Sequence, residues 1–165
     1  MNATAVGLSR EYEQQRYTDP YNILRSELIY GDGFQSPGGV AGFRATLADR
    51  MPIANGMELL DIGSGLGGAV FDLASRFSVQ ITGIDTAPVM TQLASKRQSA
   101  LDPDGHTYFV TGDVYSTELH PDNFDCCIDF GQHRHEALTE TKTSVGSALV
   151  SHRPHPLLST ELIKL

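Results

Sequence analysis

The sequence has few of the features that mark secreted or membrane proteins. Only two of its 165 residues are cysteines, and they are neighbours, Cys126 and Cys127. Because adjacent residues of a strand point to opposite faces, we expect no disulfide between them. So few cysteines are typical of a reducing compartment, and we predict a cytoplasmic protein. No apolar run reaches the roughly 18 residues that a membrane-spanning helix needs, so we expect no membrane insertion.

Basic residues are also scarce and form no runs. Twelve Lys and Arg stand against 20 Asp and Glu, which gives a formal net charge of −8. An acidic chain without basic clusters repels phosphate backbones and anionic lipid surfaces. We therefore expect neither nucleic acid nor a membrane as a partner, and we assign no metal ligand.

The composition changes near residue 130. Residues 1–130 hold 17 acids and 8 bases, whereas residues 131–165 hold 3 acids and 4 bases. Four of the six histidines also lie in the last 35 residues. Such a shift usually marks a boundary, so we treat residues 131–165 as a separate, divergent and poorly ordered tail.

Strand and helix patterns alternate before that boundary. Short apolar runs that predict buried strands are found at residues 57–62, 79–84, 107–111 and 124–130. Apolar residues at helical spacing predict helices that begin near residues 40, 68 and 86–88. This order predicts an α/β fold with a parallel sheet and helices on both faces. Ligands of such folds bind at the carboxyl ends of the strands.

The strongest motif is the glycine loop Asp61-Ile62-Gly63-Ser64-Gly65-Leu66-Gly67-Gly68. Its glycines allow a ligand to approach the backbone, and the helix that follows favours an anion at its N-terminus. Gly63, Gly65 and Gly68 also fit the dinucleotide pattern GxGxxG, and Asp85 follows at the distance of a ribose-binding carboxylate. These features alone leave an adenosyl ligand and NAD both open.

Two further acids favour the adenosyl ligand. Asp61 lies inside the first strand, where a dehydrogenase usually has an apolar residue, and Asp113 ends the third strand. Acids at three successive strand ends resemble the class I S-adenosylmethionine-dependent methyltransferases. The resemblance implies a Rossmann-like sheet with S-adenosylmethionine as cofactor. It also implies that the glycine loop binds the methionine end, Asp85 with Thr86 the ribose, and Asp113 with Val114 the adenine.

The segment before the loop resembles a narrower family. Tyr30–Gly39, which reads YGDGFQSPGG, is similar to the FGEGF-x-S-x-GG signature of phosphoethanolamine N-methyltransferases. The segments at residues 15–19 and 22–25 are also similar to that family, and the resemblance covers roughly residues 14–130. It implies methyl transfer to the nitrogen of a small phosphobase, such as phosphoethanolamine. Residues 1–39 would then form an entry and lid segment, and residues 40–130 the cofactor-binding core.

The same resemblance assigns further residues. Gln35 and Ser36 join the cofactor-binding set, while Tyr17 and His135 match a tyrosine–histidine pair that closes the site and helps to handle the proton of the amine. His135 is placed by counting from Phe124-Asp125 without gaps.

Most of the C-terminal half of such a fold has no counterpart in the sequence. The class I sheet normally has seven strands, and four are used by residue 130. We therefore expect a truncated fold whose fourth strand has an uncovered edge, open to self-association. Two functions remain open beside each other: an active N-methyltransferase, and a cofactor-binding module without turnover. An NAD-dependent reductase is a weaker alternative.

Overall fold

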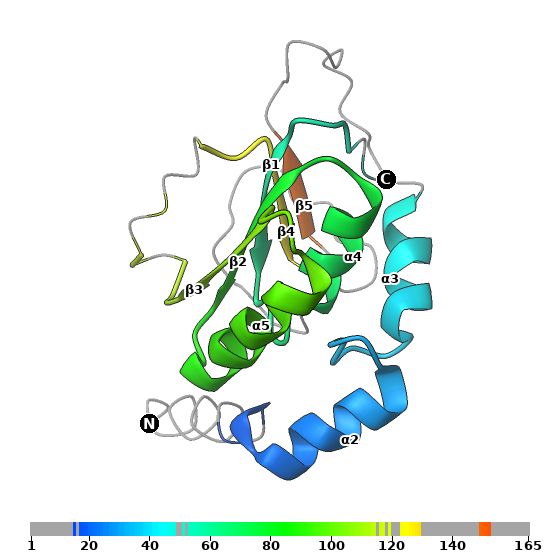
Figure 1. Cartoon of the computed structure of the whole chain (residues 1–165), viewed down its shortest axis with the longest axis vertical. Helices are drawn as coiled ribbons and strands as arrows, with labels where there is room; N and C mark the ends of the chain where they lie inside the picture. The colour runs from blue at the N-terminus through cyan, green and yellow to red at the C-terminus, as the bar shows by residue number, and fades with distance from the viewer. Residues whose placement is uncertain are drawn as a thin grey trace, which may run out of the picture.

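The protein is described here by a computed structural model of residues 15, 17–48, 51, 53–114, 116–117, 119, 123–129 and 149–152. One sheet organises these residues, in the strand order β3-β2-β1-β4-β5 (Figure 1). Its strands are β1 (Glu58–Ile62), β2 (Gln80–Asp85), β3 (Thr107–Thr111), β4 (Cys126–Asp129) and β5 (Leu149–His152). The first four are parallel to one another, and β5 is antiparallel to β4.

Four helices accompany the sheet in the described part of the chain: α2 (Pro20–Tyr30), α3 (Gly39–Ala48), α4 (Gly68–Arg76) and α5 (Pro88–Leu101). Local chemistry sets several of their ends. The Asp19 carboxylate caps α2 by accepting from the N–H groups of Tyr21 at 2.8 Å and Asn22 at 3.2 Å. Pro20 and Pro88 occupy first-turn positions, where the missing N–H costs nothing. None of these helices is long and apolar enough to cross a membrane.

The two crossover helices α4 and α5 lie on the same face of the sheet. The ring of Phe109 in β3 contacts Phe71 of α4, and Thr111, two residues further on, contacts Thr91 of α5. Residues two apart in a strand share a face, so both helices pack on the side to which Phe109 and Thr111 point. On the opposite face, the described cover is made by loop residues, among them Leu119 and Phe124.

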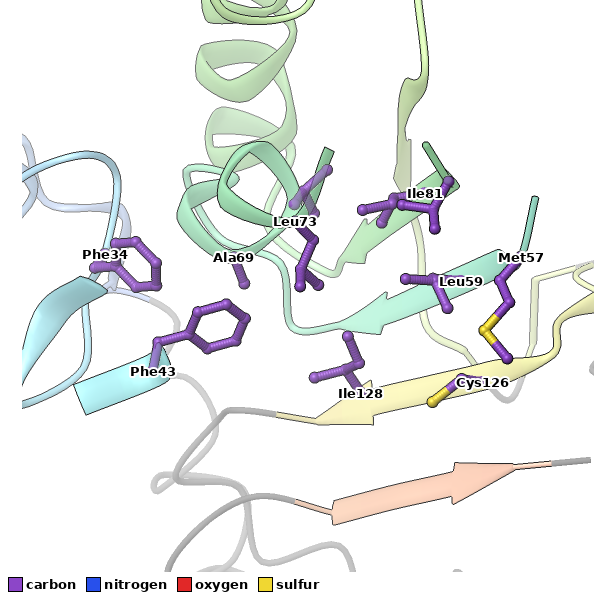
Figure 2. Close-up of a cluster of buried hydrophobic side chains, with 11 residues drawn as sticks. Phe34, Phe43, Met57, Leu59, Ala69, Leu73, Ile81, Cys126 and Ile128 are labelled. Carbon is purple, nitrogen blue, oxygen red and sulfur yellow. The ribbon is translucent and has the colours of Figure 1, made fainter. Parts of the chain in front are cut away.

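The larger apolar core lies between the sheet and α3 and α4 (Figure 2). Leu59 and Ile81 are fully buried there against Leu73 of α4. The rings of Phe34 and Phe43 lie 5.4 Å apart between centroids, which joins the segment before α3 to this core. Burial raises the pKa of the Cys126 thiol to about 12, with smaller contributions from Cys127 and Asp125, so this cysteine acts as a small apolar residue.

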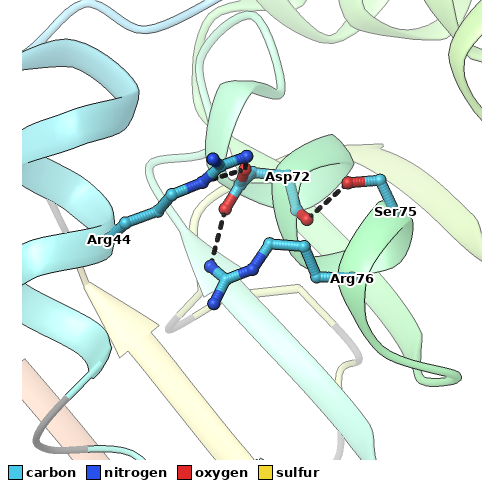
Figure 3. A network of polar contacts seen from close by, with 4 residues as sticks. All are labelled: Arg44, Asp72, Ser75 and Arg76. Atoms are coloured by element: carbon cyan, nitrogen blue, oxygen red, sulfur yellow. Dashed lines mark hydrogen bonds and ion pairs between the residues drawn. The ribbon is translucent and has the colours of Figure 1, made fainter.

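Helices α3 and α4 are also joined by charge (Figure 3). The buried carboxylate of Asp72 accepts from Arg44 Nε of α3 at 2.8 Å and from Arg76 Nη1 at 3.1 Å. Both arginines remain partly exposed to solvent, whereas the carboxylate of Asp72 is buried. The two cationic partners compensate the buried charge of Asp72. The network fixes α3 on the first crossover helix.

The structure confirms the Rossmann-like parallel sheet and differs from the prediction in two details. The helix after β2 begins at Pro88, within the range 86–88 that the sequence predicted, and Ala87 is its N-cap. The first difference is α2, which was not predicted from the sequence. The outer edge of β4, expected to be bare, is paired with β5. In the described sheet the edge strands are β3 and β5. The proposed tail, residues 131–165, is described only at 149–152.

Candidate cofactor-binding site

The glycine loop turns sharply at the carboxyl end of β1. The N–H groups of Gly63 and Ser64 both donate to the carbonyl of Ile84, at 2.8 and 3.0 Å, so the loop is tied to the end of β2. Gly63, Gly65 and Gly67 all have positive φ, at 74, 53 and 83°. A side chain would strain each of these positions, which explains the glycine spacing that the sequence shows.

Asp85 connects the loop to the start of α5. Its Oδ2 accepts from the Gly65 N–H at 2.9 Å, and its Oδ1 accepts from the Ala87 N–H at 2.8 Å. Each carboxylate oxygen has two lone pairs, so each retains one after these bonds. Asp85 is therefore held by the backbone while it keeps acceptor capacity for two hydroxyl groups.

The other two predicted acids, Asp61 and Asp113, lie on or just after the strands next to that of Asp85, and they differ in burial. Asp61 is buried in β1, with its Cα opposite Gly83 of β2 and Ile128 of β4. Asp113 is exposed and follows β3, whose end is joined to that of β2 by a 3.0 Å bond from Gly112 N–H to the Asp85 carbonyl. The three acids therefore lie together at the carboxyl ends of neighbouring strands, as the sequence predicted.

Thr86 and Val114 behave differently from each other. Thr86 is exposed next to Asp85. The side chain of Val114 packs against the apolar cluster that contains Leu60, Ile84 and Phe124. Thr86 is thus open to a ligand, while the side chain of Val114 serves the packing on the second face of the sheet.

Residues 31–38, between α2 and α3, lie on the glycine loop, and we call them the cover segment. A Cβ on Gly65 would stand 2.7 Å from Oε1 of Gln35, and a Cβ on Gly68 would stand 2.8 Å from the backbone of Gly33 and Phe34. At Gly68 the neighbouring atoms belong to the backbone, so glycine is required there, whereas the Gln35 amide near Gly65 is the end of a flexible side chain. The structure therefore brings Gln35 onto the loop, and the half-buried Ser36 is its neighbour.

Tyr17 lies beside the same loop. It packs with Ile23 of α2 against the buried cluster of Leu66, Ala87 and Met90, which joins the glycine loop to the start of α5. The predicted entry-segment residue is thus next to the glycine loop, although 44 or more residues separate it from Asp61–Gly68 in the sequence. His135 lies outside the described residues.

A polar pocket of 410 Å³ lies at the opposite end of the strands, between the C-terminal ends of α4 and α5. Asp102 and His106 line it. It is remote from the glycine loop, at the amino ends of the strands. Ligands of open α/β sheets bind at the carboxyl ends, so we assign the cofactor to the glycine loop and not to this pocket.

Comparison with known proteins identifies the family. A family model described as a methyltransferase domain matches residues 59–149, more than half of the chain. The chain belongs to this family of methyltransferase domains. Phosphoethanolamine N-methyltransferase 1 of Arabidopsis thaliana is 32% identical over 117 residues, which are 71% of this chain and 23% of the relative. The corresponding enzyme of Plasmodium falciparum is 29% identical over 113 residues, 68% of this chain and 41% of the relative.

A solved structure supports the same assignment. Phosphoethanolamine N-methyltransferase 2 of Haemonchus contortus, in complex with phosphomonomethylethanolamine and S-adenosylhomocysteine, superposes with a TM-score of 0.61 at 32% identity. The match covers 68% of this chain and 26% of that one. This methyltransferase domain thus spans less than half the length of each of these relatives. It is of class I, close to the phosphoethanolamine N-methyltransferases, and its cofactor is S-adenosyl-L-methionine rather than NAD.

The residues of the domain fit that cofactor. The loop is a cradle from which side chains are excluded, Gly63 is exposed in it, and Asp85 keeps two acceptor positions next to it. Asp85 would hold the ribose hydroxyls, the backbone of the loop would hold the methionine end, and Asp113 would contact the adenine. When bound, S-adenosylmethionine supplies an electrophilic methyl group on its sulfonium. Sequence analysis missed Glu27 and Arg97, which meet at Gly33 of the cover segment from positions far apart in the chain.

Proposed function

We propose that the chain transfers the methyl group of S-adenosylmethionine to the nitrogen of a small phosphobase, such as phosphoethanolamine, in the cytoplasm. The observation that carries the proposal is the position of Tyr17, whose ring packs on the cluster joining the glycine loop to α5. The rate of an in-line displacement depends on how the amine is held against the methyl group. Residues that lie where donor and acceptor meet therefore have a large effect on the rate. The similarity of residues 17–39 to the entry segment of phosphoethanolamine N-methyltransferases supports the same acceptor.

The residues of the chain have separate tasks in this proposal. The backbone of the glycine loop and Asp85 bind and orient the donor. The cover segment excludes water from above the loop, since Gln35 and Phe34 lie directly on it. The hydroxyl of Tyr17 acts on the amine and its proton, because the amine must be unprotonated when it attacks. His135 is the second group proposed for that proton.

The alternative is a cofactor-binding module without turnover, because the contacts of the glycine loop and Asp85 described above concern the donor site alone. Binding calorimetry with S-adenosylmethionine and a radiolabelled methyl-transfer assay with phosphoethanolamine distinguish the two functions. Donor binding with product formation supports the enzyme. Donor binding without methylated product supports the module, and tighter binding of NAD than of the donor contradicts both.

A substitution of Tyr17 tests the role of its hydroxyl. Tyr17→Phe should lower the rate of methyl transfer about 100-fold or more, the size of a typical acid–base contribution, with nearly unchanged donor affinity. Tyr21→Phe is the matched control, since Tyr21 lies four residues further along the chain, in the first turn of α2, and is 73% exposed. Loss of donor affinity with intact turnover in Tyr17→Phe would contradict the assignment.

A further inference from the structure

Three distant segments meet at Gly33 of the cover segment. Its N–H donates to Glu27 Oε2 of α2 at 3.0 Å. Arg97 Nη2 of α5 lies 3.7 Å from Glu27 Oε1. The guanidinium of Arg97 also lies against Gly33, since it occupies the space that a Cβ at this position would need. Glu27 of α2 and Arg97 of α5 therefore both contact Gly33.

Gly33 is at the same time in contact with the cofactor-binding loop. A Cβ on Gly33 would stand 3.0 Å from the carbonyl oxygen of Leu66, and a Cβ on Gly68 would stand 2.9 Å from the carbonyl oxygen of Gly33. The position of Gly33 thus sets how closely the cover segment lies on the glycine loop. A displacement of Gly33 would therefore also change the contact between the cover segment and the glycine loop.

The backbone of the cover segment needs such an external hold. Gly31, Asp32 and Gly33 have φ of 68, 54 and 79°, and Asp32 is the one non-glycine residue with positive φ in the described chain. A left-handed conformation is unfavourable for a residue with a side chain and persists where surrounding contacts determine it. The bond from Gly33 to Glu27 is such a contact.

The contact is also able to open. The side chains of Arg97 and Glu27 are 27% and 38% exposed, so water and salt reach the ion pair and weaken it. A partly exposed ion pair of this kind stabilises the position of the cover segment only weakly, so the segment can still move. The segment lies against the glycine loop, the assigned donor site, through Gly33, Phe34 and Gln35.

We propose that Glu27 and Arg97 are positioning residues that latch the cover segment over the donor, and that their loss speeds donor release. This inference rests on the cofactor site described above and adds no group to the chemistry. It predicts that the latch controls release of the donor and its product, whereas Tyr17 acts on methyl transfer itself.

The full chain and four variants test the latch. Arg97→Gln and Glu27→Ala break it, Arg97→Lys keeps the charge, and Lys96→Gln removes the same charge from the exposed neighbour of Arg97. The release rate of S-adenosylhomocysteine is measured by stopped flow. In parallel, amide exchange of residues 31–38 is measured by mass spectrometry without ligand.

We expect Arg97→Gln to raise the release rate about 2–5-fold, the size of a part-exposed ion pair. Glu27→Ala should raise it about tenfold or more, because the bond from Gly33 is lost too. Exchange of the cover segment should rise in the same order, and Arg97→Lys and Lys96→Gln should stay within twofold of the unsubstituted chain.

Two results would overturn the latch. One is release and exchange in Arg97→Gln and Glu27→Ala that match Lys96→Gln. The other is a lower melting temperature in both variants with unchanged release, which would make the contacts purely structural. If the unsubstituted chain binds no S-adenosylhomocysteine, the cofactor site itself fails, and the exchange of the free protein then decides the latch alone.

Discussion

At the scale of single residues, Asp85 has two tasks that are usually considered separately. Its carboxylate fixes the glycine loop through Gly65 and the start of α5 through Ala87, and it keeps an acceptor position on each oxygen. A ligand ribose therefore meets a carboxylate that is already oriented. Preorganisation of this kind lowers the entropy that binding has to overcome.

Asp85→Ala should weaken S-adenosylmethionine binding by about 1.5–3 kcal/mol, because two hydrogen bonds to a charged acceptor are lost. Asp113→Ala should cost less, since we expect one contact with the adenine amino group in place of two with the ribose. Isothermal titration calorimetry of both variants provides the comparison. An unchanged dissociation constant for Asp85→Ala would show that the ribose is held elsewhere, and a larger loss for Asp113→Ala would exchange the two roles.

Ser64 presents a different situation at the centre of the same loop. Its hydroxyl is buried beneath the loop and against Gly83, and it has no hydrogen-bond partner among the described residues. A buried unsatisfied polar group is costly, so Ser64→Ala should raise the free energy of unfolding by about 1 kcal/mol in the absence of ligand.

Thr107→Val is the matched control for Ser64→Ala, since Thr107 is also buried but its hydroxyl donates to Asp102 Oδ2 at 2.8 Å. Deletion of this satisfied hydroxyl should lower the free energy of unfolding by about 1.5–3 kcal/mol. Urea unfolding monitored by circular dichroism measures both. If Ser64→Ala were the destabilising variant of the two, the hydroxyl of Ser64 would have a partner in solution.

At the scale of the elements, the sequence predicts the helices and strands whose burial is periodic. The strand predicted at residues 107–111 agrees with β3, and the helix predicted to begin near residue 68 agrees with α4. The failure at α2 has a physical reason, because this helix buries no residue and its Tyr21, Leu24 and Leu28 are exposed. Its signal was the local cap of Asp19 and Pro20 and not an apolar stripe.

The contacts between elements are harder to predict than the elements themselves. Seventy residues separate Glu27 from Arg97, and 28 separate Arg44 from Asp72. Nothing in the spacing of such charges distinguishes a partner from a solvated surface residue. The glycine loop and its acids were predicted because each lies at a strand end, where the chain order already fixes the place in the sheet.

The turn between α5 and β3 contains a carboxylate, Asp102, whose contribution to the free energy of unfolding should depend on pH. Burial would raise the pKa of Asp102, but hydrogen bonds from Thr107 and His106 outweigh it, and the pKa of this carboxyl lies below its ordinary value of 3.8. A carboxyl whose pKa is lower in the folded state adds stability above the unfolded pKa, and this stability is lost as the pH falls through the folded pKa.

Asp102→Asn should therefore lower the free energy of unfolding by about 1.5–3 kcal/mol at pH 7, and the difference should shrink as the pH falls below about 4. Asp104→Asn removes the same charge from the exposed neighbour and should change the stability by less than about 0.5 kcal/mol. Urea titrations from pH 7 to pH 3 measure both variants. A difference for Asp102→Asn that did not change with pH would mean that its charge is not the source of the stability.

At the scale of the whole molecule, β5 determines how the sheet ends. It adds an antiparallel strand to four parallel ones, a common arrangement at the edge of α/β sheets. The sequence did not predict it because four residues of a polar tail give almost no periodic signal, and the pairing depends on β4, whose paired residues are 20 to 26 positions away in the sequence. Self-association at a bare β4 edge is therefore not what this sheet predicts.

Two proline substitutions test whether β5 covers β4 in solution. In an antiparallel pair, the N–H groups of neighbouring residues point alternately to the partner strand and away from it. Val150 and Ser151 pair with Ile128 and Cys127, so only one of the variants Val150→Pro and Ser151→Pro removes a bond to β4. We expect one variant to lose about 2–3 kcal/mol of stability and to aggregate as the β4 edge opens, while the other, which loses an outward N–H, stays close to the unsubstituted chain. Urea unfolding and light scattering provide the measurements. Two variants with equal stability and equal mass would mean that β5 does not hold this edge, and the apolar fourth strand would then again be the expected site of self-association.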